Sequence, residues 1–143
     1  MPRGTNDTID NFAQVYPAYL AGVSDLLIAL RGVCDGDLDT GLIMAVIGDR
    51  HLARRLSKDG PRYDELGTTE VAPGPTVNAL SIAQFTDIPR ETVRRKVNAL
   101  IKRGWVVADQ NGNLAATRLA ATDLADGTQA AVTFIEKLAH VRR

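Results

Sequence analysis

The feature that most constrains the fold of this 143-residue chain is the order of signals between residues 81 and 108. Residues 82–86 are a short apolar stretch, and residues 87–89 contain the Asp and Pro that are typical of a turn. Residues 90–103 have the period of an amphipathic helix, which Gly104 is expected to end. Two short helices joined by a tight turn leave few folds open to the chain.

A β-hairpin is predicted directly after these two helices. Residues 105–108 and 114–117 are short strand-like stretches, and Asn111-Gly112 lies between them. This dipeptide is the strongest short-range hairpin signal, because both of its residues tolerate positive φ. Residues 76–117 therefore predict a helix-turn-helix followed by a hairpin wing.

Helices are also predicted on the N-terminal side of this motif, within residues 7–57. Apolar residues recur at steps of three and four over residues 12–30, which is the spacing of one helical face. Because proline fits best in a first helical turn, we expect the main helix to begin near Pro17. Gly32 and Gly36 are expected to end it.

Asp37 is predicted to cap a second helix that continues to about Ser57. Residues 58–75 have neither a helical nor a strand period and are rich in Gly and Pro, so we expect a long loop there. A short strand is expected at residues 77–80, with Ser81 capping the helix that follows it.

A C-terminal helix is predicted within residues 118–143, with Thr122 as its N-cap. Its apolar stripe and the stripe of the first helix are expected to contribute to the core and to a contact between two copies of the chain. The residues expected to do so are Tyr19, Val23, Leu27, Leu30, Phe134, Ile135 and Leu138.

The composition favours a single domain over residues 1–143. Apolar residues make up 45% of the chain and aromatic residues only 5%, so the core is expected to be aliphatic. The single cysteine, Cys34, excludes an intrachain disulfide, and we expect it to be a buried packing residue in a cytoplasmic protein. The polar N-terminus and the interrupted apolar stretches predict neither export nor a membrane span.

The sequence contains no catalytic or metal-binding pattern. His51 and His140 are far apart, and residues 35–46 fail to match a calcium loop at its sixth and twelfth positions. No nucleophile motif, phosphate-binding loop or dinucleotide fingerprint occurs. We therefore expect no enzyme activity, no cofactor and no metal.

Positive and negative residues are segregated along the chain, although the formal net charge is zero. Residues 1–49 carry a net charge of −5, and residues 89–103 carry +5. A neutral protein with such blocks can present one basic face, which is the electrostatic signature of a nucleic-acid-binding protein.

The basic block coincides with the helix predicted at residues 90–103. At 100° per residue, Val93, Val97 and Leu100 share one sector that Ile101 widens, and we expect this stripe to pack on the preceding helix. The opposite sector carries Glu91, Thr92, Arg95, Asn98 and Lys102, and Arg94 and Lys96 lie on its two sides. In a major groove, Arg and Glu side chains can recognise guanine and cytosine, and flanking cations lie near the phosphates.

A simpler alternative is that Glu91 and Arg95, four residues apart, form a salt bridge on a solvated helix. That alternative explains the helix alone. It does not explain why a short helix, a turn and a hairpin occur at the required offsets, and this context favours DNA binding.

The string Arg-Glu-Thr-Val-Arg-Arg at residues 90–95 resembles the recognition helix of the cyclic-AMP receptor protein group. This resemblance implies that Arg90, Glu91 and Arg95 face bases. The order of helices around the motif is similar to that of the multiple-antibiotic-resistance regulator (MarR) family, whose outer helices interlock in a dimer. The specific match covers residues 81–108, and over the rest of the chain the similarity is one of layout.

Two further expectations concern the edges of this motif. Ser81, at the start of the motif, is included among the DNA-binding candidates. The hairpin tip at residues 109–113 contains no Arg or Lys, so we expect the helix rather than the wing to carry most of the binding.

The sequence therefore predicts a mainly α protein with a small β-hairpin wing, a winged helix-turn-helix with flanking N- and C-terminal helices. The predicted function is that of a transcriptional regulator that binds double-stranded DNA sequence-specifically as a homodimer. The alternative is a winged-helix protein-interaction module without specific DNA binding. A third possibility is a regulator that responds to a small molecule held between the N-terminal helices and the winged domain, although the sequence does not indicate such an effector.

Overall fold

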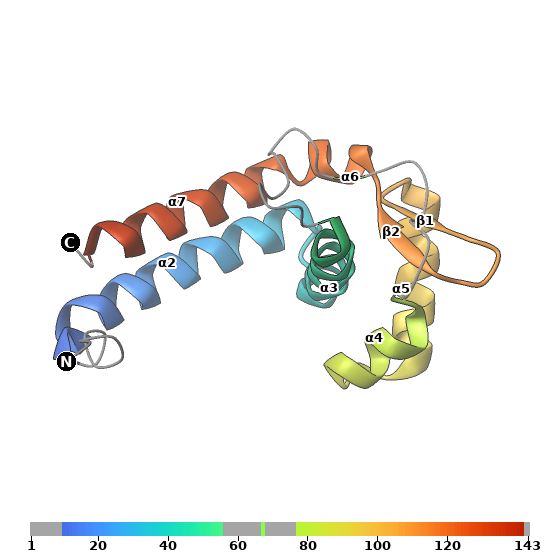
Figure 1. Cartoon of the computed structure of the whole chain (residues 1–143), viewed down its shortest axis with the longest axis horizontal. Coiled ribbons are helices and arrows are strands. Elements are labelled where there is room, and N and C mark those ends of the chain that lie inside the picture. Colours follow the sequence, from blue (N-terminus) through green and yellow to red (C-terminus); the bar gives the residue numbers. More distant parts are fainter. Residues whose placement is uncertain (1–9, 56–66, 68–76, 142–143) are drawn as a thin grey trace. The chain divides into compact units, whose positions relative to one another are not determined.

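The computed structural model describes residues 10–55, 67 and 77–141. In chain order its elements are α2 (Phe12–Val33), α3 (Leu38–Arg55), α4 (Ala79–Thr86), α5 (Arg90–Arg103), β1 (Val106–Ala108), β2 (Leu114–Ala116), α6 (Arg118–Asp123) and α7 (Ala125–Val141) (Figure 1). This mainly helical fold with one antiparallel two-stranded sheet confirms the predicted class. The loop predicted at residues 58–75 lies outside the described residues, apart from Gly67.

The chain forms two compact units. Met1–Gly36 and Leu124–Arg143 make the first, which contains α2 and α7 and is called the helical-hairpin unit. Asp37–Asp123 makes the second, which contains α3, α4, α5, α6 and the two strands and is called the central unit.

α2 begins at Phe12, so the start predicted near Pro17 is wrong. The Val15 N–H donates to the Asn11 carbonyl over 3.0 Å, which establishes helical hydrogen bonding ahead of the proline. The rings of Phe12 and Tyr16 also stack one turn apart, with centroids 4.8 Å from each other. Pro17 removes one backbone donor from an exposed part of the helix, where water can satisfy the carbonyl that loses its partner.

α2 and α7 lie side by side and run in opposite directions (Figure 1). A Cβ at Gly22 would lie 2.1 Å from Cδ2 of Phe134, so the ring fills the space that any side chain at Gly22 would need. The same ring contacts Tyr19, with centroids 6.2 Å apart. A Cβ at Gly127 of α7 would lie 3.3 Å from Leu30, so a second glycine allows close approach near the other end of the helix pair.

Gly22→Ala is expected to destabilise the protein by about 1–3 kcal/mol, because the Phe134 ring must move to accept the added methyl group. Gly32→Ala is the matched control in the same helix. No atom lies within 4 Å of a Cβ at Gly32, so the better helix propensity of Ala is expected to stabilise the protein by about 0.5–1 kcal/mol. Urea unfolding followed by circular dichroism measures both changes. Equal stability of the two variants would contradict the close contact between Gly22 and Phe134.

The helical-hairpin unit exposes large apolar side chains, namely Phe12, Tyr16, Tyr19, Leu20, Leu27 and Ile28 on α2 and Ile135 on α7. Tyr19, Leu27 and Ile135, which the sequence predicts to contribute to the core, are 43%, 45% and 64% exposed, so within one chain they are only partly covered. By length and composition alone, α2 is apolar enough to cross a membrane. Only 6% of its most apolar 18-residue window is buried, so much of this helix surface has no cover within the described chain.

The core of the central unit is mainly aliphatic, as the composition predicts, and contains the single tryptophan. Its most deeply buried side chains are Trp105, Ile43, Ile47, Ile82 and Val93. The predicted hairpin is confirmed, because β1 pairs with β2 in antiparallel register from Val106 opposite Ala116 to Ala108 opposite Leu114. The apolar face of α3 and the hairpin therefore support the pair formed by α4 and α5.

The predicted start of α4 is wrong. Only Val77 of the strand expected at residues 77–80 pairs with the hairpin, through a single bridge to Leu114. Asn78 is the N-cap of α4: its side chain accepts from the Ser81 N–H over 2.9 Å, and the Ser81 hydroxyl accepts from the Asn78 N–H over 3.0 Å. Ser81 is therefore the third helical residue of a capping box rather than the cap itself.

The predicted cap of the C-terminal helix is also wrong. Thr122 lies inside α6, and Thr117 caps that helix by accepting from the Ala120 N–H over 3.2 Å. A separate helix, α7, begins at Ala125. The error arises because the cap follows β2 directly, so that the strand end and the helix start have no loop between them.

Candidate functional site

A tight turn at residues 87–89 joins α4 to α5, as predicted. Asp87 has a left-handed backbone with φ 59°, a conformation that Asp tolerates better than most residues. The Thr86 hydroxyl accepts from the N–H of Ile88 over 3.3 Å, and the Ile88 side chain is buried. Pro89, with φ −52°, then leads into α5 without a side-chain cap. Buried Ile88 and the fixed φ of Pro89 therefore set the direction in which α5 leaves the turn.

α5 has the predicted bounds, Arg90–Arg103, and buries the narrow part of the predicted stripe. Ile101, which the sequence predicts to widen that stripe, is 37% exposed, so this part of the prediction is wrong. Val93, Val97 and Leu100 are 0%, 4% and 3% exposed. Gly104 ends the helix with φ 86°, and the first strand of the hairpin begins soon after it. Because one narrow stripe is buried, the opposite side of α5 is fixed as the exposed side.

Most of the candidate residues on α5 are exposed, Arg90 at the start of the helix and the others along its length. The exposed candidates are Arg90, Glu91, Arg94, Arg95, Asn98 and Lys102. Thr92 and Lys96, on the same helix, are half-buried. Ser81 is half-buried on α4, where its hydroxyl is engaged with Asn78 in the capping box.

Glu91 pairs with Arg94 rather than with Arg95. The Arg94 Nε donates to the two carboxylate oxygens of Glu91 over 3.1 and 3.0 Å. The hydrogen bond from Arg94, helped by the nearby charge of Arg95, lowers the pKa of Glu91 below its ordinary value. The side chains of Glu91 and Arg94 are 74% and 59% exposed, so water screens this pair and a competing partner can open it at small cost.

Lys96 forms an ion pair with Asp37, the residue just ahead of α3. The Asp37 carboxylate also accepts from the Thr40 N–H over 3.2 Å and from the Thr40 hydroxyl over 3.0 Å, which confirms its predicted role as the N-cap of α3. The Lys96 side chain is only 15% exposed. The hydrogen bond from Lys96 is the main reason why the pKa of Asp37 lies below its ordinary value.

The other cations of α5 fall into two groups. Arg90, Arg95 and Lys102 form no ion pair with any residue that the structure describes. The Arg103 guanidinium instead lies 3.8 Å from the centroid of the Trp105 ring, a cation–π contact at the end of the helix. Three positive side chains of α5 are therefore available to an external anion.

Trp105 holds the end of α5 against the hairpin and α6. Its side chain is fully buried, and its indole N–H donates to the Asp123 carboxylate over 2.8 Å. Thr117 strengthens the same junction: its hydroxyl donates to the Gly104 carbonyl over 2.6 Å, and its N–H donates to the Trp105 carbonyl over 3.0 Å. These contacts fix the position of the hairpin relative to α5.

The hairpin tip, residues 109–113, is a compact loop organised by one carboxylate. Asp109 accepts from the N–H groups of Asn111 and Asn113 over 2.8 and 2.9 Å. These hydrogen bonds, that of Asn113 first, lower the pKa of Asp109, and Gly112 supplies a positive φ of 82°. The tip therefore carries a fixed negative charge and no cation.

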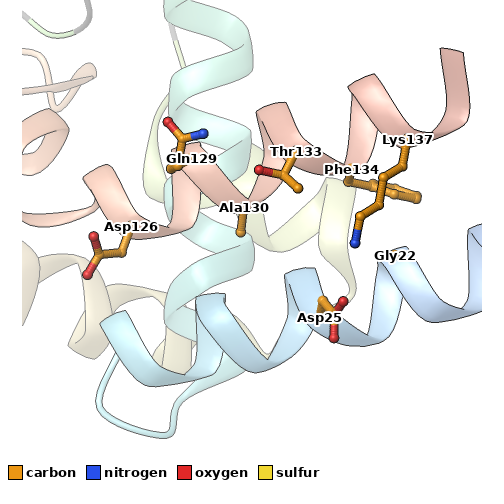
Figure 2. Close-up of a pocket in the computed structure, with 8 residues that line it drawn as sticks. All are labelled: Gly22, Asp25, Asp126, Gln129, Ala130, Thr133, Phe134 and Lys137. Carbon is orange, nitrogen blue, oxygen red and sulfur yellow. The ribbon is translucent and has the colours of Figure 1, made fainter. Parts of the chain in front are cut away.

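A shallow groove of about 280 Å³ lies between α2 and α7 within the helical-hairpin unit. Figure 2 shows Phe134 and Gly22 along it, with Asp25, Asp126 and Lys137 at its sides. Its other lining residues are Gln129, Ala130 and Thr133. Among the residues that the structure describes, no group of three or more His, Cys, Asp and Glu side chains could hold a metal ion.

Two contacts of the site are not among the sequence-based predictions. Asp37 is predicted only as a cap, because Lys96 is distant in the sequence and no local pattern relates the two residues. The contact of Arg103 with Trp105 is also not predicted, although a signal for it is present, since a cation and an aromatic residue flank the glycine that ends α5.

Comparison with known proteins finds no family model that matches this chain, no similar curated protein and no similar solved structure. The residues and geometry of the site therefore carry the functional conclusion.

The lowered pKa of Asp37 leads to a prediction for stability at low pH. A carboxylate with a lowered pKa stabilises the folded state above its unfolded value, here 3.8, and this stabilisation is lost as the pH falls through the lower folded value. Asp37→Asn keeps an oxygen that can cap α3 but removes the charge. The stability advantage of the wild type over Asp37→Asn should thus be constant near neutral pH and shrink below pH 3.8.

Urea unfolding followed by the fluorescence of Trp105, the single tryptophan, measures this advantage as a function of pH. Asp39→Asn is the control, because it removes a carboxylate from the same helical turn without breaking an ion pair of the described chain. A constant advantage of the wild type over Asp37→Asn down to pH 2 would show that the ion pair is not formed in solution.

Proposed function

We propose that the central unit is a winged helix-turn-helix that binds double-stranded DNA sequence-specifically, with α5 in the major groove. The observation that carries this proposal is the division of α5 into one fully buried stripe and one exposed polar side. The stripe docks the helix on the unit. On the other side stand the amide of Asn98 and two cations, Arg95 and Lys102, that form no ion pair with the described residues. Such a helix, following a short helix and a tight turn, has the form that enters a major groove.

The first two turns of α5 hold the proposed base-reading residues. Recognition helices contact bases mainly through their N-terminal residues, which here are Arg90, Glu91, Thr92 and Arg95. The exposed guanidinium of Arg95 can donate two hydrogen bonds to guanine, and Asn98 can pair with adenine in the same way. Lys102, in the last turn, is assigned to a phosphate.

Glu91 and Arg94 are proposed to act together. Both side chains are well exposed, so a DNA phosphate can replace the Glu91 carboxylate as the partner of Arg94. The carboxylate released in this way can accept a hydrogen bond from the amino group of cytosine. The pair therefore holds both side chains near their DNA contacts before the DNA arrives.

The hairpin has a secondary part in this proposal. Asp109 places a negative charge in the tip, and the tip contains no Arg or Lys. A DNA backbone repels such a tip, so the affinity comes from α5. The wing contributes by fixing the end of α5 through Trp105 and Thr117.

A direct test is Arg95→Ala, compared on DNA selected for binding to the wild type and on a scrambled duplex. Arg95→Ala is expected to remove about 1–3 kcal/mol of the preference for the selected duplex. Lys102→Ala is the matched control on the same helix face. It is expected to weaken binding to both duplexes alike and to reduce the salt slope by about one. Fluorescence polarisation measures the affinities of the wild type and both variants for both duplexes, and equal losses on both duplexes for Arg95→Ala would remove its base-reading role.

A second candidate function is that of a winged-helix module that binds a protein instead of DNA. It is favoured by the acidic hairpin tip and by Phe85 of α4, which is 66% exposed with the Arg50 guanidinium 5.5 Å from its ring centroid. Exposed aromatic and Arg side chains are common in protein interfaces. An absence of salt-dependent DNA binding at low ionic strength would favour this candidate.

The proposed regulator acts as a homodimer through the helical-hairpin unit. The exposed apolar side chains of α2 need a partner surface, and a second copy of the same helices supplies a self-complementary one. A single helix contacts few bases, so pairing onto a palindromic site increases both affinity and specificity. We place this dimer in the cytoplasm, with no enzyme activity, cofactor or membrane contact as part of the proposal.

Ile28→Glu is expected to convert the dimer into a monomer. Ile28 is 70% exposed, so a charge there should not disturb the folded chain, but it would be costly inside a dimer contact. Leu119→Glu on α6 is the control, because Leu119 is 48% exposed in the central unit. Sedimentation equilibrium gives the mass of each variant. A wild type that is monomeric at micromolar concentration, or an unaltered mass of Ile28→Glu, would contradict the assignment.

A further inference from the structure

Lys96 lies on α5 among the residues proposed to contact DNA, yet its ammonium group is held by the protein. It pairs with the Asp37 carboxylate, and only 15% of its side chain is exposed. On the sequence alone, Lys96 is a phosphate ligand on the flank of the groove. The structure instead directs its charge to the start of α3.

Both partners of this ion pair are attached to rigid parts of the central unit. Val93 and Val97, close to Lys96 on α5, are fully or almost fully buried. Asp37 is fixed by its two hydrogen bonds to Thr40 in the first turn of α3. The pair is therefore a defined link between two helices, and less exposed than the pair of Glu91 with Arg94.

Between its two ends, which the turn at residues 87–89 and Trp105 hold, α5 needs a link of this kind because its mid-helix packing contacts have little directional preference. The buried stripe consists of the aliphatic residues Val93, Val97 and Leu100, and burial of apolar surface is not directional. Such a stripe permits small rotations of the helix about its axis. A charge-assisted hydrogen bond on one flank requires a defined distance and angle, and so restricts the rotation.

We propose that Lys96 is a positioning residue for DNA recognition, and that its ion pair with Asp37 sets the rotation of α5 and thereby which side chains face the bases. This inference rests on the proposed function of α5. Asp37, which lies just ahead of α3 and not on the helix of the base-reading residues, then contributes to sequence discrimination. Lys96 itself does not contact a DNA phosphate.

The experiment compares Asp37→Asn, Lys96→Met and the double variant with the wild type. Asp37→Asn keeps the capping oxygen of α3, and Lys96→Met keeps the length and the apolar stem of the side chain. Lys96→Arg tests rescue by a second cation, and Asp39→Asn controls for the loss of a carboxylate near Asp37. Circular dichroism confirms that each variant is folded. The probes are a duplex selected from random DNA by the wild type and a scrambled duplex of the same composition.

For the selected duplex, Asp37→Asn and Lys96→Met should each weaken binding roughly threefold to tenfold, and the double variant should be no weaker than either. Binding to the scrambled duplex and the salt slope should stay at wild-type values, because no phosphate contact is lost. Lys96→Arg and Asp39→Asn should retain the discrimination of the wild type. A purely structural role would lower the affinity for both duplexes together.

Three results would overturn the inference. If Lys96 is a phosphate ligand, Lys96→Met weakens both duplexes and lowers the salt slope by about one, as Lys102→Met should. In that case Asp37→Asn would tighten binding, because it frees the ammonium group. A wild type that binds neither duplex would contradict both the proposed function and this inference. If Asp37→Asn distinguishes the selected duplex from the scrambled one as well as the wild type does, only this inference is contradicted.

Discussion

The burial of one aliphatic stripe of α5 is the constraint on which the rest of the candidate site depends. Val93, Val97 and Leu100 are almost completely buried, so the helix cannot turn its basic side inward without exposing them. The turn at residues 87–89 fixes where the helix begins, and Trp105 fixes where it ends through its bond to Asp123. The exposed polar side of α5 is thus a consequence of packing and does not require a bound partner to form.

The charged residues of α5 differ in their ion-pair partners. Lys96 is mostly covered and pairs with the partly exposed Asp37, whereas Glu91 and Arg94 form a more exposed pair, in which a phosphate can replace the Glu91 carboxylate. Arg95 is left without an ion-pair partner among the described residues. The cations of α5 look alike in the sequence, but in the folded protein they differ: Lys96 is bound to Asp37, Arg94 is paired with an exposed carboxylate, and Arg95 has no ion-pair partner among the described residues.

The sequence predicts those elements of the fold whose signals lie within their own residues. The bounds of α5 and its buried residues Val93, Val97 and Leu100 follow from helical period and from Gly104, and the hairpin follows from Asn111-Gly112, so the sequence was sufficient for them. The starts of α4 and α6 were missed because Asn78 and Thr117 are caps placed directly after strand residues, where a strand pattern hides them. The partner of Lys96 was not predictable, because it is brought near only by the packing of α3.

The most direct measurement of the central claim is selection of bound duplexes from random DNA by the wild-type protein. We expect enrichment of one motif, arranged as two inverted half-sites whose centres are about 10–10.5 base pairs, or a multiple of that, apart. Such a result would show sequence recognition by α5 and two-fold symmetry together. A bound pool with no motif beyond that of the starting library would contradict it.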